Sequence, residues 1–176
     1  ERTFAHLFKN NCYSFVHATS GSLLGVGLAR ELCKGSDILS INTEEENNFL
    51  LTMFQTKWNG PNEILLGMFY DSDDDALKWF DTSELTYKNF REGAQVEMGL
   101  LTCAKMNTST GRWDLVNCET FAQAGTLCKT KASTRLHITL VTFQTRYNLN
   151  GFCLSTKHAG LCHLLNASTT AHIKER

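Results

Sequence analysis

The sequence lacks a long apolar run: no stretch of its 176 residues approaches the roughly 20 apolar residues that a membrane-spanning helix needs. Its first residues are polar and contain no apolar core of a signal peptide. We therefore expect no membrane span in this chain and interpret it as a mature chain or a fragment. Its net charge of −1 leaves no excess of basic residues, which argues against a nucleic-acid partner.

Zinc knuckles with Cys-x-x-Cys spacing are also missing, although the chain contains seven cysteines. The wide spacing of these cysteines favours disulfides formed in an oxidising compartment over a zinc site. Three of them lie within 103–128 and another lies far upstream, which suggests one short and one long cross-link. The odd number leaves at least one cysteine without a partner in the chain. The seven are Cys12, Cys33, Cys103, Cys118, Cys128, Cys153 and Cys162.

Patterns typical of catalysis are absent as well. The six histidines show no metal-binding or catalytic spacing, and no nucleophile is recognisable beside a base. We therefore predict a binding module rather than an enzyme. The histidines are His6, His17, His137, His158, His163 and His172.

The sequence does contain a sharp change of charge near residue 130. Residues 1–130 carry 11 basic and 17 acidic side chains, a net charge of −6, whereas residues 131–176 carry six and one, a net charge of +5. Such a change predicts a domain boundary. We expect one folded domain over 1–130 and an atypical basic tail over 131–176 that is mostly disordered and has no transmembrane helix.

A first helix is predicted over about 22–34. Leu24, Leu28 and Leu32 recur at a spacing of four residues, which is typical of one helix face. Gly35 follows directly and is a common helix terminator. The glycines early in this segment weaken the helix but do not abolish the periodicity.

A second helix is predicted over about 44–57. Thr43 fits the N-cap position, and Glu46 stands three residues later, as in a capping box. The acidic residues of 44–46 also favour the positive end of the helix dipole, so we interpret them as capping groups rather than catalytic carboxylates. The helix should stop before the single proline, Pro61.

Short strands account for most of the remaining domain. The continuous apolar run of 63–70 predicts a strand buried on both faces. Two helices with a set of short antiparallel strands indicate the α+β class. Further strands are expected at 7–17 (an edge strand or hairpin arm), 77–80, 103–106, 112–114 and 124–129, with polar turns at 71–75 and 81–84 and an irregular segment at 91–100.

This order of elements and motifs resembles the C-type lectin-like domain over about residues 7–130. Its characteristic strand motif appears as Leu65-Leu66-Gly67-Met68, and its tryptophan motif as Trp113-Asp114-Leu115. Within the family, the chain looks most like the small single-domain type I transmembrane receptors of monocytes, macrophages and dendritic cells. The resemblance implies an extracellular or cell-surface location and roles in endocytosis, phagocytosis, cell adhesion or migration.

The resemblance also implies the disulfide framework. It would join Cys33 to Cys128 and Cys103 to Cys118. Cys12 matches the second cysteine of an N-terminal hairpin found in longer members, but the matching partner is absent, so we expect Cys12 to be a free thiol or to have its partner just before Glu1.

Sugar-binding members hold Ca²⁺ through a Glu-Pro-Asn or Gln-Pro-Asp triplet and the tryptophan motif. Here Ala94-Gln95-Val96 replaces the triplet, and Asp114 is the retained acid of the second motif. Ca²⁺ needs six to eight oxygen ligands, so we predict no calcium-dependent mannose or galactose binding. Possible residual ligands for weak calcium binding, or for contact with a ligand, are Asp71, Asp75, Glu97 and Asp114.

Trp79 and Trp113 could form a sugar-stacking pair, but their strand positions favour a place in the core. Asn107 and Asn166 begin glycosylation sequons. The leading hypothesis is a receptor domain that binds an extracellular protein or glycan without calcium. A calcium-dependent lectin and a soluble decoy without an anchor are the alternatives.

Overall fold

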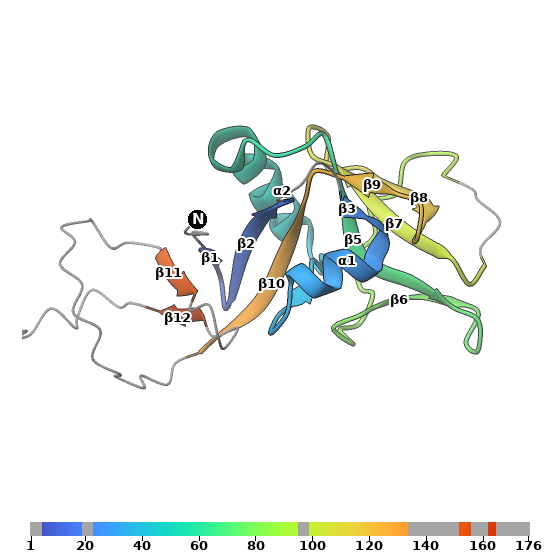
Figure 1. The fold of residues 1–176 in the computed structure, drawn as a ribbon, viewed down its shortest axis with the longest axis horizontal. Coiled ribbons are helices and arrows are strands. Elements are labelled where there is room, and N and C mark those ends of the chain that lie inside the picture. Colours follow the sequence, from blue (N-terminus) through green and yellow to red (C-terminus); the bar gives the residue numbers. More distant parts are fainter. Residues whose placement is uncertain (1–4, 19–22, 95–98, 134–151, 156–161, 165–176) are drawn as a thin grey trace, which may run out of the picture.

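The computed structural model describes residues 5–18, 23–94, 99–133, 152–155 and 162–164, and it contains two helices beside antiparallel sheets (Figure 1). This confirms the predicted α+β class. The helices are α1, Gly25–Leu32, and α2, Glu44–Met53, which continues into one π-helical turn, η1, Phe54–Trp58.

Helix α2 begins as the sequence predicts. The Thr43 hydroxyl accepts a hydrogen bond from the Glu46 N–H at 3.1 Å. The Glu46 carboxylate accepts one from the Asn42 N–H at 2.9 Å, so the return bond reaches the residue before the cap and not Thr43 itself. The helical segment ends at Asn59, whose φ of 45° lies in the left-handed region that asparagine tolerates.

Helix α1 is shorter than predicted and buries a different face. It starts at Gly25, whose N–H donates to the Phe121 carbonyl at 2.9 Å and whose φ is +73°. Its buried residues are Gly25 and Ala29, whereas Leu28 is 45% exposed. The leucine spacing therefore predicted the wrong buried face. The helix packs against its neighbours through the small residues Gly25 and Ala29 instead.

The first sheet has the order β12-β11-β1-β2-β10-β4. Strand β2 pairs with both β1 and β10, so it is an arm of the β1–β2 hairpin and not an edge strand. Strand β10 continues past residue 130, and two short tail strands join this sheet. The rest of the basic tail lies outside the described residues. Bounds are β1 Ala5–Phe8, β2 Asn11–His17, β4 Asp37–Ile38, β10 Gly125–Ser133, β11 Phe152–Ser155 and β12 Cys162–Leu164.

The second sheet has the order β6-β5-β7-β8, and a two-stranded sheet pairs β3 with β9. Central strand β5 is buried from Ile64 to Met68, as the apolar run predicts. Bounds are β3 Leu23–Leu24, β5 Glu63–Asp71, β6 Ala76–Trp79, β7 Thr102–Asn107, β8 Trp113–Asn117 and β9 Ala122–Gln123. Figure 1 shows α1 in front of the region between β10 and the second sheet.

Two disulfides hold these layers together. Cys33, directly after α1, is bonded to Cys128 of β10, and Cys103 of β7 is bonded to Cys118 after β8. All four lie in one buried cluster with Ala29, Ile38 and Leu65. Both pairs are those that the sequence resemblance implies. Cys12 is also disulfide-bonded and is therefore not a free thiol.

Candidate functional site

Asp114, the retained acid of the tryptophan motif, lies on β8 beside a hollow of about 220 Å³. The segment before it is aligned by backbone hydrogen bonds, from the Arg91 N–H to the Trp113 carbonyl and from the Trp113 N–H to the Asn89 carbonyl. This alignment brings the Arg91 Nε to 2.8 Å from Asp114 Oδ1. The hollow is lined by Arg91, Gly93, Ala94, Lys105, Asp114, Leu115 and Val116.

The Arg91 guanidinium is the cation that contacts the Asp114 carboxylate. The aspartate side chain is 24% exposed and the arginine side chain 65%, so the ion pair is partly open to water. Within the hollow, Ala94 contributes a methyl group in place of an oxygen ligand. Lys105 also lines the hollow and is paired with Glu63 at 2.7 Å. The lining therefore contains two cationic side chains, Arg91 and Lys105, and one carboxylate, Asp114.

Lys78 of β6 contacts two carboxylates of the acidic turn between β5 and β6. Lys78 Nζ donates to Asp71 Oδ2 at 2.7 Å and also contacts Asp74. The Tyr70 hydroxyl donates to Asp75 Oδ1 at 2.6 Å. Asp75 itself has a φ of 49°, which closes the turn in the left-handed region. These carboxylates are therefore engaged by donors of the same hairpin.

Ionisation in this turn follows from those contacts. The hydrogen bond from Lys78 lowers the pKa of Asp71, and the same contact raises the pKa of Lys78. The hydrogen bond to Asp75 raises the pKa of the Tyr70 hydroxyl, because ionisation would place two negative charges together. At neutral pH the turn holds charged Asp71 and Lys78 as an ion pair.

The structure places the three described acids of the predicted site on different elements. Asp71 and Asp75 belong to the β5–β6 hairpin, whereas Asp114 lies on β8. Glu97 lies outside the described residues. Across the described ranges, no group of three or more His, Cys, Asp or Glu side chains is arranged to hold a metal ion.

Trp79 and Trp113 lie in the core and are not a sugar-stacking pair. Their exposures are 2% and 0%, and their rings meet edge to face at 5.8 Å. Tyr87 and Phe90 also pack edge to face against Trp113, and its Nε1 donates to Asn47 Oδ1 at 3.3 Å. Because Trp113 is buried in the core, the tryptophan motif holds the next residue, Asp114, in a partly exposed position.

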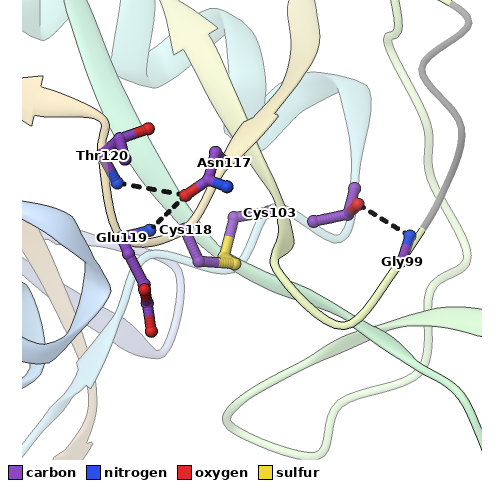
Figure 2. The surroundings of a disulfide bond; sticks show 7 residues. Gly99, Cys103, Asn117, Cys118, Glu119 and Thr120 are labelled. Carbon is purple, nitrogen blue, oxygen red and sulfur yellow. Dashed lines mark hydrogen bonds between the residues drawn. A yellow bond between two sulfur atoms is a disulfide. The ribbon is translucent and has the colours of Figure 1, made fainter.

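The loop disulfide fixes the far end of β8 (Figure 2). The side-chain oxygen of Asn117 accepts hydrogen bonds from the N–H groups of Glu119 and Thr120, at 2.9 and 3.1 Å. The carbonyl of Cys118 accepts from the Val26 N–H at 2.7 Å, which connects this turn to the start of α1. The turn after β8 is thus held by the Cys103–Cys118 disulfide and by a backbone hydrogen bond to α1.

The model of the lectin C-type domain family matches residues 26–136, well over half of the chain. The chain belongs to the C-type lectin family. The pig CD302 antigen is 40% identical over 124 residues, which cover 69% of this chain and 51% of that protein. The chain thus spans about half the length of this relative.

Solved structures agree on the lectin fold. Human lithostathine matches with a TM-score of 0.61 at 21% identity, covering 72% of this chain and 88% of that one. The Ca²⁺-independent C-type lectin SPL-2 from Saxidomus purpuratus matches with a TM-score of 0.57 at 18% identity, covering 70% and 88%. At these identities the likeness shows the fold alone. C-type lectin domains bind glycan or protein ligands, and none of the helices in the described part of this one could span a membrane.

Asn107, the described sequon of this lectin domain, lies at the end of β7. Its side-chain oxygen accepts hydrogen bonds from the N–H groups of Ser109 and Thr110, both at 3.0 Å. Within the sequon, Ser109 is exposed, Asn107 is half-buried and Thr108 is buried. The second sequon, at Asn166, lies outside the described residues.

Sequence reasoning missed Arg91 and Lys78, the two cations that engage the predicted acids. Lys78 had a detectable signal, because a hairpin over 71–76 brings positions 71 and 78 close together. Arg91 had none, since its partner is 23 residues away and the intervening segment has no regular period.

Proposed function

We propose that this C-type lectin domain is the ligand-binding part of a cell-surface receptor and recognises an extracellular protein or glycan without calcium. Roles in endocytosis, phagocytosis, cell adhesion or migration follow from the receptors that its sequence resembles. The similarity to CD302 antigen supports a receptor-like chain. A binding role rather than an enzymatic one is in keeping with the family of ligand-binding domains to which the chain belongs.

The ion pair between Arg91 and Asp114 carries this proposal. A lectin calcium site would need Asp114 as a carboxylate ligand, and here a guanidinium already lies against that carboxylate. A divalent ion would have to displace Arg91 and then find several further oxygens, where Ala94 offers a methyl group. Ligand contact in this hollow therefore rests on Arg91, Lys105 and polar backbone groups.

The test is a glycan array and a cell-binding assay with the full chain, each with calcium and with EDTA. We expect the same binding in both conditions, and no heat of Ca²⁺ binding by calorimetry at millimolar concentrations. Arg91→Gln should weaken ligand binding, whereas Lys88→Gln removes one exposed positive charge elsewhere and should leave it unchanged. Binding that EDTA abolishes would contradict the proposal.

We also propose that Asn107 carries an N-linked glycan when the chain passes through the secretory pathway. Its place in an exposed turn supports this, because glycosylation requires access to the side-chain amide. The full chain, secreted from mammalian cells, should lose mass on treatment with an N-glycosidase. Asn107→Gln should remove that shift, and a shift that persists only through Asn166 would contradict the assignment.

A further inference from the structure

A second hollow, of about 210 Å³, lies beside the end of α1 and away from Asp114. Arg30, Lys34, Asp37 and Phe80 provide its functional side chains, and Gly35, Ser36 and Ile38 complete it. None of these residues contributes to the ligand-binding hollow described above. The two hollows therefore can be altered independently.

Arg30 is held on an aromatic ring. Its Cζ lies 4.9 Å from the centre of the Phe80 ring, and Phe80 stacks in turn on Phe69 at 4.7 Å between ring centres. A cation over an aromatic ring is attracted by the ring itself, so this contact does not require a hydrogen-bond acceptor for the guanidinium N–H groups. Across the described residues, no acceptor forms a hydrogen bond or ion pair with Arg30, so these donors remain available to a ligand.

Lys34 provides a second cation at the same hollow. It directly follows Cys33, whose bond to Cys128 fixes the backbone at this point. In the described part of the chain, its ammonium group likewise has no carboxylate partner. Arg30 lies in the last turn of α1 and Lys34 lies two residues beyond its end, and because both line the same hollow their like charges repel each other. A bound anion would relieve that repulsion.

Asp37 limits the charge of the site. With two cations and one carboxylate, the lining carries a net charge of +1. That balance suits one compact anionic group better than a dense polyanion, which the net charge of −6 over residues 1–130 would also repel.

We infer that this hollow binds a single tetrahedral oxyanion, a sulfate or phosphate ester, between the guanidinium edge of Arg30 and the ammonium group of Lys34. A planar donor edge held by stacking is pre-organised for two oxygens of such a group. This site is separate from the calcium-independent site proposed above and does not depend on it.

The full chain is titrated by NMR with sodium sulfate, sodium phosphate, N-acetylglucosamine 6-sulfate and unsulfated N-acetylglucosamine, at constant ionic strength. Backbone signals of 34–37 should shift with the oxyanions and with the sulfated sugar, but not with the plain sugar. A lower Kd for the sulfated sugar than for phosphate would identify a sulfated glycan as the source. The reverse order would identify a phosphate ester.

Variants distinguish a built site from general charge. Arg30→Gln and Lys34→Gln should each raise the Kd about fivefold, the effect of losing one exposed charge contact. Asp37→Asn should lower the Kd, and Lys88→Gln should leave it unchanged. Equal effects of Arg30→Gln and Lys88→Gln, or no shifts at 34–37, would overturn the inference. Circular dichroism of each variant confirms that the fold is retained.

Discussion

Glu46 connects the second helix to two neighbouring strands of the first sheet, β2 and β10. Its Oε1 accepts from the Tyr13 hydroxyl at 2.6 Å and lies 2.6 Å from Lys129 Nζ. Lys129 also donates to the Ser40 carbonyl at 3.0 Å. Burial and the charge of Glu46 both raise the pKa of the Tyr13 hydroxyl, so this tyrosine stays neutral and donates. The cap residue predicted from sequence thus has a second, tertiary role.

Lys129→Met should therefore be strongly destabilising, by about 3–5 kcal/mol, because it leaves the buried Glu46 carboxylate without its ionic partner. Urea unfolding at pH 7 measures this loss. The deficit should shrink in the double variant Glu46→Gln/Lys129→Met, which also removes the uncompensated charge. Lys88→Met, at an exposed position, should stay within about 0.5 kcal/mol of wild type. A deficit of equal size in the single and the double variant would show that lost packing, not charge, is responsible.

Lys78→Gln tests the electrostatics of the acidic turn. The pKa of Asp71 is lowered in the folded chain by its contact with Lys78, so the variant should raise it toward the ordinary aspartate value. The stability that this contact contributes is present above the unfolded pKa and is lost as the pH falls through the folded one. Carbon-detected NMR titration of the Asp71 carboxyl reports the shift. An unchanged pKa would assign the lowering to the turn backbone instead.

At the level of elements, sequence reasoning succeeded where the signal is local. The cap at Thr43 and the apolar run of β5 depend on neighbours in the chain, and both elements form as predicted. The two-residue strands β3, β4 and β9 were not predicted, because two residues show no period and their partners are distant in sequence. The buried face of α1 was wrong for a related reason. Its close approach selects glycine and alanine, which carry no hydrophobic periodicity.

Gly67→Ala should disrupt the centre of β5. A Cβ at this position would lie 2.5 Å from the Ile38 carbonyl oxygen, and that backbone is fixed between β10 and α1. Such overpacking typically lowers the free energy of unfolding by about 1–3 kcal/mol, and we expect a loss of that size here. Gly27→Ala is the matched control: nothing lies within 4 Å of its added Cβ, and it should stabilise α1 by up to about 1 kcal/mol. Thermal unfolding of both variants decides, and equal Tm values would refute this account of β5.

For the molecule as a whole, the sequence identified the acids of the candidate site but not their state. Asp71, Asp75 and Asp114 were recognised because they match acidic positions of the family that the sequence resembles. What each acid does depends on Lys78, Tyr70 and Arg91, which folding brings to it. A sequence shows which carboxylates are present. Whether they can bind a ligand depends on which of them have no hydrogen bond or ion pair within the folded protein.

The disulfides Cys33–Cys128 and Cys103–Cys118 span very different lengths of chain, 95 and 15 residues, yet their four cysteines share one buried cluster. Replacing either pair by alanine therefore removes similar packing. If restriction of the unfolded chain dominates, loss of the long bond should cost about 4–5 kcal/mol and loss of the short one about 3 kcal/mol. Urea unfolding of the two double variants measures the difference. Equal costs would mean that burial of the cystine, and not loop length, sets the stability of this lectin fold.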